Sequence, residues 1–281
     1  MADSTTIRAF VVGHPVAHSR SPMIHGHWLK AFGIDGSYER IDIGPTAFAD
    51  FIRRLPSSGY AGGNVTIPHK EAAFTLAGRR DEAAELIGAA NTLWLEDGSV
   101  CASNTDASGL ASDLDARAPQ WRTAPSALVF GAGGAARAVL FALRQAGIDR
   151  IHLVNRTLDR ARELADRFGG GVICHGPAAV DELASESALV VNTTALGMHG
   201  KGTPMNDLSR LPDEGVVVDI VYTPLKTPFL RAAEDRGLTA IDGLGMLLHQ
   251  AAPGFERWFG QRPVVTEELR ALVVADLESN R

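Results

Sequence analysis

The chain has 281 residues, of which 45% are apolar, so it is long enough for one large or two ordinary domains with complete cores. Charges of both signs are scattered along it and sum to −6, which argues against nucleic acid as a partner. No segment approaches the roughly 18 uninterrupted apolar residues of a membrane span, and the start lacks the pattern of a secretory signal. Cys101 and Cys174 show no CxxC spacing, so neither a disulfide framework nor a zinc site is indicated. We expect a soluble cytoplasmic protein.

Short β-branched runs alternate with helical patterns over the first hundred residues. Strands are predicted to begin near Ile7, Ser37, Tyr60 and Asn91, and the last of these runs contains Glu-Asp-Gly, a hairpin signal. Between the first two strands, SPMIHGHWLKAFG predicts a helix that Ser21 caps, with Pro22 in its first turn and Gly33 at its end. This alternation is typical of a parallel sheet covered by helices on both faces.

A second βα series begins at Ser126 with SALVFGAGG and continues through RIHLVNR, ALVVNTT and GVVVDIV. The segment PQWRTAP, residues 119–125, is predicted to be the loop between the two series. After Gly243 the pattern is helical. The sequence therefore predicts an α/β fold of two domains, residues 1–106 plus 244–281 and residues 107–243, with the C-terminal helices returning to the first domain.

A dinucleotide-binding pattern, GxGxxA, lies directly between a predicted strand and a helix of the second series. Gly131 permits the tight turn, Gly133 lets a pyrophosphate approach the backbone, and Ala136 allows close helix packing. The phosphates would lie at the helix N-terminus, where backbone N–H groups point outward. A close-packed turn without a ligand is the alternative, since the pattern alone is weak.

The strand that follows this pattern distinguishes NADP from NAD. About 24 residues after Gly131, where an NAD-specific domain carries an acidic residue for the ribose 2′-hydroxyl, the chain has Asn155, Arg156 and Thr157, with Arg160 one helical turn later. Guanidinium groups bind a 2′-phosphate that a carboxylate would repel. We therefore predict NADP(H) as the cofactor; the alternative is that both arginines are solvated residues at a helix start.

Polar groups gather in four segments of the first domain: GHPVAHSRSP, GGNVTIPHK, GAANTL and SNTDASG. Groups beyond the carboxyl ends of strands in an open α/β sheet line one crevice, so these segments are expected to converge. Together they offer hydroxyls, amides, one ammonium and one carboxylate, a set that suits a small polyhydroxylated acid: Ser19, Ser21, Thr66, Thr105, Asn64, Asn91, Lys70 and Asp106.

Each of these residues also has an ordinary structural interpretation when it is taken singly. Ser21, Asn91 and Asn104 are residue types that cap helices and form turns, and Lys70 with Asp106 could be a surface pair worth under about 1 kcal/mol. Three histidines, His14, His18 and His69, have no spacing that requires a metal and are interpreted as loop residues. The joint occurrence of the polar segments favours the functional interpretation.

Eight motifs, in order from Gly13 to Trp258, resemble those of the shikimate dehydrogenase family: GHPVAHSRSPMIH, GGNVTIPHK, GAANT, NTDASG, GAGGAARA, NRTLDRA, DIVYTPLKTPFL and DGLGMLLHQAAPGFERW. The resemblance implies reversible NADPH-dependent reduction of 3-dehydroshikimate to shikimate, on the pathway to aromatic amino acids. It also implies a three-layer substrate-binding domain, a Rossmann-type NADP-binding domain, and C-terminal helices that pack on the first. Its partners would be these small molecules, with a monomer and a homodimer both open.

The resemblance also assigns roles to residues, motif by motif. It implies substrate contacts at Ser19, Ser21, Asn64, Thr66, Lys70, Asn91, Asp106, Tyr222 and Gln250. It implies an NADP site at Gly131, Gly133, Gly134, Ala135, Asn155, Arg156, Thr157 and Arg160, with Thr193, Gly243 and Met246 near the nicotinamide. Three departures from the usual pattern, Ala107, Gly26 and the NTTALGM segment, remove no charged catalytic group but leave substrate preference open.

The chemistry of ketone reduction gives Lys70 and Asp106 distinct roles. Hydride transfer to a ketone leaves charge developing on oxygen, which needs a proton donor or a cation about 3 Å away. We predict that Lys70 supplies the proton and that Asp106 orients the ammonium. The alternatives are a quinate/shikimate dehydrogenase of broader specificity, a non-catalytic NADP- and shikimate-binding sensor of the same fold, and another NADP-linked reductase that shares only the cofactor domain.

Overall fold

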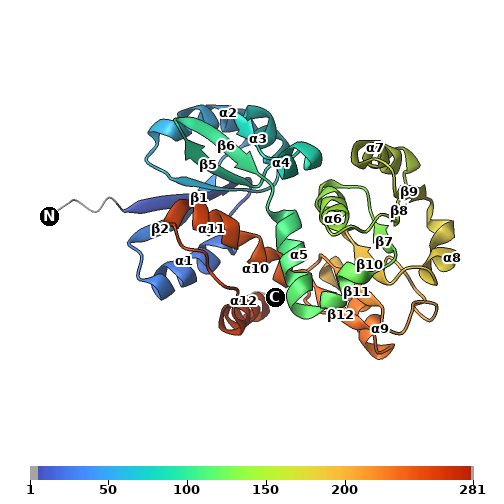
Figure 1. The fold of residues 1–281 in the computed structure, drawn as a ribbon. Coiled ribbons are helices and arrows are strands. Elements are labelled where there is room, and N and C mark those ends of the chain that lie inside the picture. The colour runs from blue at the N-terminus through green and yellow to red at the C-terminus, as the bar shows by residue number, and fades with distance from the viewer. Residues whose placement is uncertain (1–5, 280–281) are drawn as a thin grey trace. The chain divides into compact units, whose positions relative to one another are not determined.

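Two six-stranded sheets organise residues 6–279, the part of the chain that the computed structural model describes (Figure 1). One unit contains the residues up to Asp106 together with those from Leu248 onward, and the other contains Ala107–Leu247. The two changes of unit therefore fall at the start of helix α5 (Asp106–Arg117) and inside helix α10 (Leu244–His249). No helix among the described residues is both long and apolar enough to span a bilayer.

The first unit contains a mixed sheet in the order β2-β1-β3-β5-β6-β4. Its strands are β1 (Ile7–Gly13), β2 (Gly36–Asp42), β3 (Gly62–Val65), β4 (Arg79–Arg80), β5 (Thr92–Glu96) and β6 (Ser99–Ser103). Its helices are α1 (Ser21–Phe32), α2 (Pro45–Arg54), α3 (Lys70–Leu76), α4 (Glu82–Ile87), α11 (Ala251–Phe259) and α12 (Glu267–Ser279).

The direction of β5 brings the polar segments of this unit to one edge of the sheet. The alternation of strands and helices is typical of a parallel sheet, but this sheet is mixed, because β5 runs antiparallel to both β3 and β6. Thr92 at its start lies opposite Asn64 near the end of β3 and opposite Ser103 at the end of β6. The segment before β5 therefore lies at the same end of the sheet as the segments after β3 and β6, and this end is called the polar edge below.

The predicted hairpin is confirmed: Asp97 and Gly98 join β5 to β6 with φ angles of 50° and 75°. Positive φ at both central positions is the geometry of the tight turn that matches strand twist. The predicted end of α1 is also confirmed, because Gly33 adopts the left-handed conformation there. The predicted cap is wrong: Ser21 is already inside α1, Arg20 occupies the cap position, and no side chain caps the helix.

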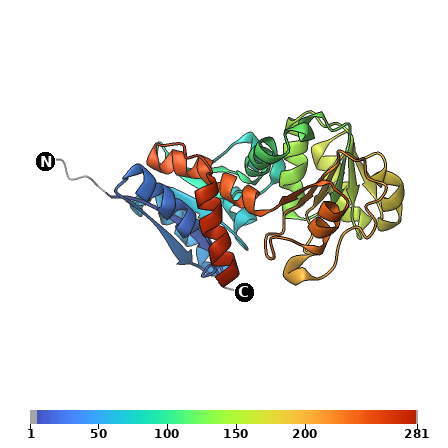
Figure 2. The same ribbon diagram turned by 90° about the horizontal axis from the view of Figure 1, so that it is seen from below.

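Helices cover both faces of the first sheet. Phe10 and Val12 of β1 pack with Phe48 and Ile52 of α2 in one cluster of buried residues. The opposite face carries α1 and α11, and the C-terminal helix α12 runs beside α1 (Figure 2). An ion pair of 2.9 Å between Arg20 Nε and Asp276 Oδ2 fastens α12 to the start of α1. The C-terminal helices thus pack on the first unit, as the sequence predicts.

The second unit is built on a sheet in which all strands are parallel, in the order β12-β11-β10-β7-β8-β9. Its strands are β7 (Ala127–Phe130), β8 (Ile151–Val154), β9 (Val172–His175), β10 (Leu189–Asn192), β11 (Val216–Asp219) and β12 (Thr239–Asp242). Besides α5 and α10 its helices are α6 (Gly134–Gln145), α7 (Leu158–Phe168), α8 (Val180–Ala184) and α9 (Pro228–Asp235).

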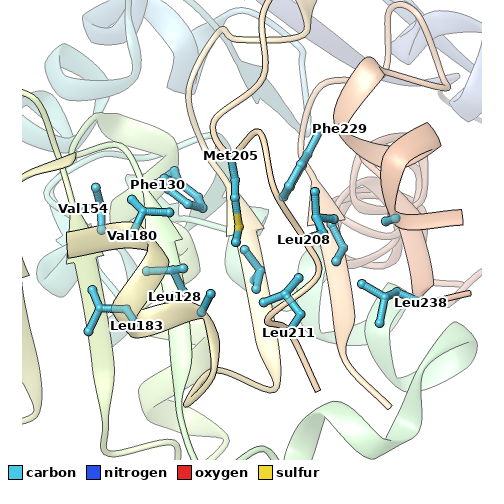
Figure 3. Close-up of a cluster of buried hydrophobic side chains, with 14 of the residues drawn as sticks. Leu128, Phe130, Val154, Val180, Leu183, Met205, Leu208, Leu211, Phe229 and Leu238 are labelled. Carbon is cyan, nitrogen blue, oxygen red and sulfur yellow. The ribbon is translucent and has the colours of Figure 1, made fainter. Parts of the chain in front are cut away.

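Buried apolar side chains join this sheet to the elements on one of its faces. Leu128 and Phe130 of β7 and Val154 of β8 belong to one cluster with Met205 and Phe229 (Figure 3). The four-residue strands β7, β10 and β11 are buried along their whole length, as expected for parallel strands covered on both faces.

The segment at residues 119–125 is not the open loop that its Pro-rich ends predict. Pro119–Thr123 forms a short 3-10 turn inside the second unit, and Trp121 is buried. The indole Nε1 of Trp121 donates a hydrogen bond of 2.8 Å to Asp115. Burial of this aromatic ring holds the segment against α5.

Candidate active site

An ion pair between Lys70 and Asp106 lies at the polar edge of the first sheet. Lys70 is the first residue of α3 and Asp106 the first of α5, and Lys70 Nζ lies 2.6 Å from Asp106 Oδ2. Their side chains are 31% and 18% exposed, so the pair is partly shielded but still open to solvent on one side. This arrangement suits a proton donor that must meet a small molecule.

Asn91 is the centre of the hydrogen-bond network around this pair. Its Nδ2 donates to Asp106 Oδ1 at 2.9 Å and to Gln250 Oε1 at 3.2 Å. Its Oδ1 accepts from the Thr105 backbone N–H at 2.8 Å and from the Thr92 hydroxyl at 3.0 Å. Asn91 therefore fixes the second oxygen of the carboxylate whose first oxygen faces Lys70.

Asn64 and Tyr38 extend this hydrogen-bond network toward helix α1. Asn64 donates through Nδ2 to the Asn91 carbonyl at 3.1 Å and to the Thr92 hydroxyl at 3.2 Å, and its Oδ1 accepts from the Tyr38 hydroxyl at 2.6 Å. Burial raises the pKa of Tyr38 well above its usual range, an effect that hydrogen bonding with Asn64 and Ser21 partly offsets. Tyr38 therefore stays a neutral hydrogen-bond donor.

His25 is packed into the same region and is fully buried. Its ring stacks on Tyr38 with centroids 4.0 Å apart, and neither ring nitrogen has a hydrogen-bond partner of good geometry. Burial lowers the pKa of His25 from 6.5 to about 3, with a smaller opposite effect of Asn64. This histidine is therefore an uncharged packing group.

The predicted hydroxyl residues lie around this edge. Ser19 and Ser21 face each other with hydroxyl oxygens 3.3 Å apart, and Ser21 is buried at the start of α1. Arg40 on β2 donates two hydrogen bonds, of 3.0 and 2.6 Å, to the Ser19 carbonyl and holds that loop. Thr66 is half-buried after β3, where its backbone N–H donates to the Val12 carbonyl at 2.9 Å.

Two of the three loop histidines have structural contacts. His14 lies 2.6 Å from Asp42 through Nδ1, and both side chains are about half exposed. His69 lies in the loop before α3, as interpreted from sequence, and it is also buried: it stacks on Phe48 with centroids 4.2 Å apart and contacts the Ile43 carbonyl at 2.6 Å. Residues 6–279 contain no group of three or more His, Cys, Asp or Glu side chains that could hold a metal ion.

The turn after β7 in the second unit has the form that a pyrophosphate requires. Gly131 adopts a φ of 101°, and a Cβ there would lie 2.7 Å from Thr193 Oγ1. At Gly133 and Gly134, where α6 begins, a Cβ would meet nothing within 4 Å. The backbone at this helix N-terminus is therefore open to a ligand, which fits a dinucleotide phosphate.

Two arginines follow β8 in the same unit. Arg156 and Arg160 are both exposed, and neither guanidinium group has an ion pair or hydrogen bond to another described residue. Asn155 donates through Nδ2 to the Thr157 carbonyl at 2.7 Å, which shapes the turn into α7. The guanidinium groups are therefore available for an anion such as a 2′-phosphate.

The remaining predicted residues of this unit lie on the segments that follow β10, β11 and β12. Thr193 is buried, and its hydroxyl donates to the Phe130 carbonyl at 2.6 Å. Gly243 lies against Ile220, where a Cβ would come within 2.1 Å of the Ile220 carbonyl oxygen. Met246 on α10 and Tyr222 after β11 are both half-buried.

Sequence reasoning did not single out Tyr38, Asn192 or Asp219, which the structure places in hydrogen-bond networks at these sheet edges. A Tyr on a strand and an Asn or Asp at a strand end carry no local motif. The signal in the sequence was that β10 and β11 both end in a polar residue after an apolar run, VVN and VVD.

The fold and site define a class: a two-unit α/β protein with a Rossmann-type sheet in one unit and a Lys-Asp pair in the other. Three family models match the chain: the shikimate dehydrogenase substrate-binding domain over residues 11–93, shikimate/quinate 5-dehydrogenase over 116–222, and the shikimate 5′-dehydrogenase C-terminal domain over 243–267. A curated relative from Mesorhizobium japonicum, shikimate dehydrogenase (NADP(+)), is 62% identical over 272 residues, covering 97% of each chain. The chain belongs to the shikimate dehydrogenase family, so that prediction is confirmed.

Solved structures of similar fold include a shikimate dehydrogenase and a quinate dehydrogenase. The shikimate 5-dehydrogenase of Thermus thermophilus, in complex with NADP(H) and shikimate, is 38% identical with a TM-score of 0.85 and covers 97% of this chain and 100% of its own. The quinate dehydrogenase of Corynebacterium glutamicum, in complex with NAD, is 29% identical with a TM-score of 0.88 and covers 96% of this chain and 99% of its own. The fold alone therefore does not separate the two activities.

Proposed function

We propose that this protein catalyses the reversible NADPH-dependent reduction of 3-dehydroshikimate to shikimate, a step toward aromatic amino acids, in the cytoplasm. The observation that carries the proposal is the Lys70–Asp106 pair, held by Asn91 at the edge of the first sheet. Relatives at 55–62% identity are NADP(+)-dependent shikimate dehydrogenases over nearly their whole length. The second unit, by this proposal, binds NADP(H), and the first binds shikimate.

The chain's own residues supply the proton and the orientation in this reaction. NADPH, when bound, supplies the hydride that reduces the ketone carbon. The ketone oxygen then takes a proton from the Lys70 ammonium, and in the reverse direction neutral Lys70 accepts it from the hydroxyl. Asp106 accepts a hydrogen bond from Lys70 Nζ and can accept another from an adjacent ring hydroxyl. Two electrons and two hydrogens are thus added to the carbonyl.

The remaining substrate contacts are assigned from the donors and acceptors that the side chains at the polar edge can offer to a ligand. Both N–H bonds of the Asn64 amide are used within the protein, so Asn64 can meet a ligand only as an acceptor. Ser19, Ser21 and Thr66 provide hydroxyls that both donate and accept. Asn91 and Gln250 complete the shell, and Tyr222 is the residue of the second unit that we assign to the substrate.

The cofactor assignment follows from the second unit. We assign the pyrophosphate to the turn at Gly131, Gly133, Gly134 and Ala135. We assign the 2′-phosphate to Arg156 and Arg160. Asn155 and Thr157 shape the turn from β8 into α7 that carries these arginines. Thr193, Gly243 and Met246 are assigned to the nicotinamide end.

The departures at Ala107 and Gly26 lie in helices: Ala107 is buried, and Gly26 has open space where a Cβ would be.

The proposal is tested by absorbance of the reduced nicotinamide, with purified protein supplied in turn with shikimate or quinate and with NADP or NAD. We expect rapid turnover only with shikimate and NADP. Comparable turnover with quinate would assign the broader quinate/shikimate activity instead. NADPH binding without turnover of either acid would exclude the enzyme and favour a sensor of the same fold.

A further inference from the structure

Two neighbouring strands of the second sheet end in polar residues on the same rung. Asn192 closes β10 and Asp219 closes β11, and the two residues are directly paired in the parallel register. Both are completely buried. Asn192 Nδ2 donates a hydrogen bond of 2.9 Å to Asp219 Oδ1 across the two strands. A polar contact therefore joins the two strand ends at the carboxyl edge, where parallel α/β sheets bind ligands.

The Asn192 side chain also organises the loop that follows β10. Its Oδ1 accepts from the Thr194 backbone N–H at 3.0 Å and from the Thr194 hydroxyl at 2.7 Å. Its Nδ2 donates a second hydrogen bond, of 3.0 Å, to the Leu196 carbonyl. The loop that begins with Thr193 is thus tied to the amide of Asn192.

The Asp219 carboxylate does the same for the loop that follows β11. Its Oδ1 accepts from the Val221 backbone N–H at 3.1 Å, and its Oδ2 accepts from the Thr227 hydroxyl at 2.7 Å. Thr227 in turn caps α9 through the Leu230 N–H at 3.3 Å. The segment between Asp219 and Thr227, which contains Tyr222, is therefore fixed at both ends by one carboxylate.

The carboxylate is held by neutral donors alone. No Lys, Arg or His side chain among residues 6–279 forms an ion pair with Asp219. A buried carboxylate is costly without partners, so the amide, hydroxyl and backbone donors must stay in place around it. Gly197 confirms the closeness of this packing, because a Cβ there would lie 3.1 Å from Thr227 and 3.3 Å from Asp219 Oδ2.

We propose that Asp219 is a positioning residue that, through Asn192 and Thr227, holds the Thr193 loop and the Tyr222 segment in one arrangement. The inference rests on the proposed function, in which Thr193 lies at the nicotinamide and Tyr222 meets the substrate. One buried carboxylate then sets the geometry for both cofactor and substrate, although it touches neither.

The test compares Asp219→Asn, Thr227→Val and Thr227→Ser with a control in the same strand pair, Val190→Ala. Asp219→Asn replaces one acceptor oxygen by an N–H group and leaves a donor unpaired. Thr227→Val keeps the shape but removes the hydroxyl, which Thr227→Ser restores. Val190 is buried on β10 and forms none of the hydrogen bonds of Asn192 or Asp219, so Val190→Ala lowers stability by creating a cavity. The measurements are Tm, the Kd of NADPH by fluorescence, and KM and kcat with shikimate and NADP.

For Asp219→Asn we expect the NADPH Kd and the shikimate KM to rise about tenfold to 100-fold, since small displacements of positioned groups have effects of that size. Thr227→Val should change both in the same direction, and Thr227→Ser should recover most of the loss. Val190→Ala should lower Tm with Kd and KM near wild type. If Asp219→Asn lowers Tm as Val190→Ala does but leaves Kd and KM unchanged, Asp219 is only structural and the proposal fails.

The outcomes separate this inference from the function on which it rests. If Asp219→Asn does not fold, Thr227→Val carries the same test, and an unchanged Kd and KM there overturn the proposal. If wild-type protein binds NADPH but does not turn over shikimate, the proposed function fails. The NADPH Kd of the variants then still decides whether Asp219 positions the cofactor loop.

Discussion

Lys70 and Asp106 meet at 2.6 Å because helices α3 and α5 both begin beside the same end of the first sheet. Lys70 approaches one oxygen of the carboxylate, while Asn91 donates to the other at 2.9 Å. The carboxylate thereby has a fixed plane, and the ammonium has a fixed position relative to it. Such an arrangement fixes the direction in which the Lys70 ammonium can donate a proton, besides supplying a positive charge.

Replacement of Lys70 tests its role as proton donor. We expect Lys70→Ala to lower kcat by on the order of 100-fold or more, because general acid-base catalysis contributes that much to a proton transfer. The measurement is steady-state turnover of shikimate with NADP. Lys30→Ala, which removes an exposed lysine of α1, serves as the control and should leave kcat unchanged. A Lys70→Ala enzyme with kcat near wild type would leave Lys70 with a binding role alone.

Replacement of Arg156 tests the predicted 2′-phosphate site. Hydrogen bonds to charged groups contribute about 1.5–3 kcal/mol, which corresponds to a factor of about 10 to 100 in affinity. We therefore expect Arg156→Ala to raise the KM for NADP by about that factor while the KM for NAD changes little. Arg162→Ala is a matched control on α7, since Arg162 pairs with Asp159 at 2.9 Å. An unchanged NADP/NAD preference in Arg156→Ala would contradict the assignment.

The glycines of the turn before α6 allow the effect on the ligand to be separated from the effect on folding. Gly133 has a φ of −101° and open space at the Cβ position, so Gly133→Ala should fold with a free energy of unfolding within about 0.5 kcal/mol of wild type. The added methyl group would occupy the path of the pyrophosphate, and we expect the NADPH Kd to rise at least tenfold. Normal NADPH binding in a folded Gly133→Ala variant would argue against this phosphate site.

Gly131→Ala provides the contrast. Its φ of 101° and the 2.7 Å approach to Thr193 Oγ1 leave no room for a Cβ, so this variant should lose stability as well as NADPH affinity. Thermal unfolding of the two variants in the absence of cofactor checks the difference. Equal Tm values for Gly131→Ala and Gly133→Ala would contradict the packing described for this turn.

Local patterns in the sequence were sufficient to predict most strands of both series, but not β4, β9 or β12. The apolar run IRAFVVG corresponds to β1, and the Asp97-Gly98 turn corresponds to the hairpin, because both depend on residues adjacent in the chain. The direction of β5 relative to β3 was not predictable in this way. It depends on long-range pairing between residues such as Asn64 and Thr92, which no local pattern specifies.

In the candidate site, too, local motifs were predictable from the sequence and long-range contacts were not. Chemically reactive residues were recognisable by type and motif, as Lys70 and Asp106 show. The residues that hold them were not: Tyr38 becomes visible only when its hydroxyl is found 2.6 Å from Asn64, and Asp219 only when it is found against Thr227. The burial of His69 was not predictable for a related reason, since a histidine after a proline in a polar segment gives no sign that Phe48 will cover it.

The buried histidine beneath Tyr38 leads to a prediction about stability and pH. The pKa of His25 falls from 6.5 to about 3 because the folded protein buries the ring, so the unfolded chain binds a proton that the folded protein excludes between these values. Stability from this group is present above pH 6.5 and is lost as pH falls toward 3. By linkage the loss between pH 7 and pH 5 is about 2 kcal/mol.

His25→Phe isolates this contribution, because phenylalanine keeps a stacked ring on Tyr38 but cannot be protonated. Asp42, whose pKa is lowered by His14, also loses stability as the pH falls, and Asp219, whose pKa is raised by burial, acts in the opposite sense. Both effects are common to the two proteins, and any packing strain from the larger ring of the variant is the same at both pH values. We therefore expect urea unfolding to show that wild type loses about 2 kcal/mol more than His25→Phe between pH 7 and pH 5. The same loss in both proteins would mean that His25 is protonated in the folded state at pH 5. Its ring would then have to reach solvent or a hydrogen-bond partner, which is contrary to its packing against Tyr38, Phe255 and Trp258.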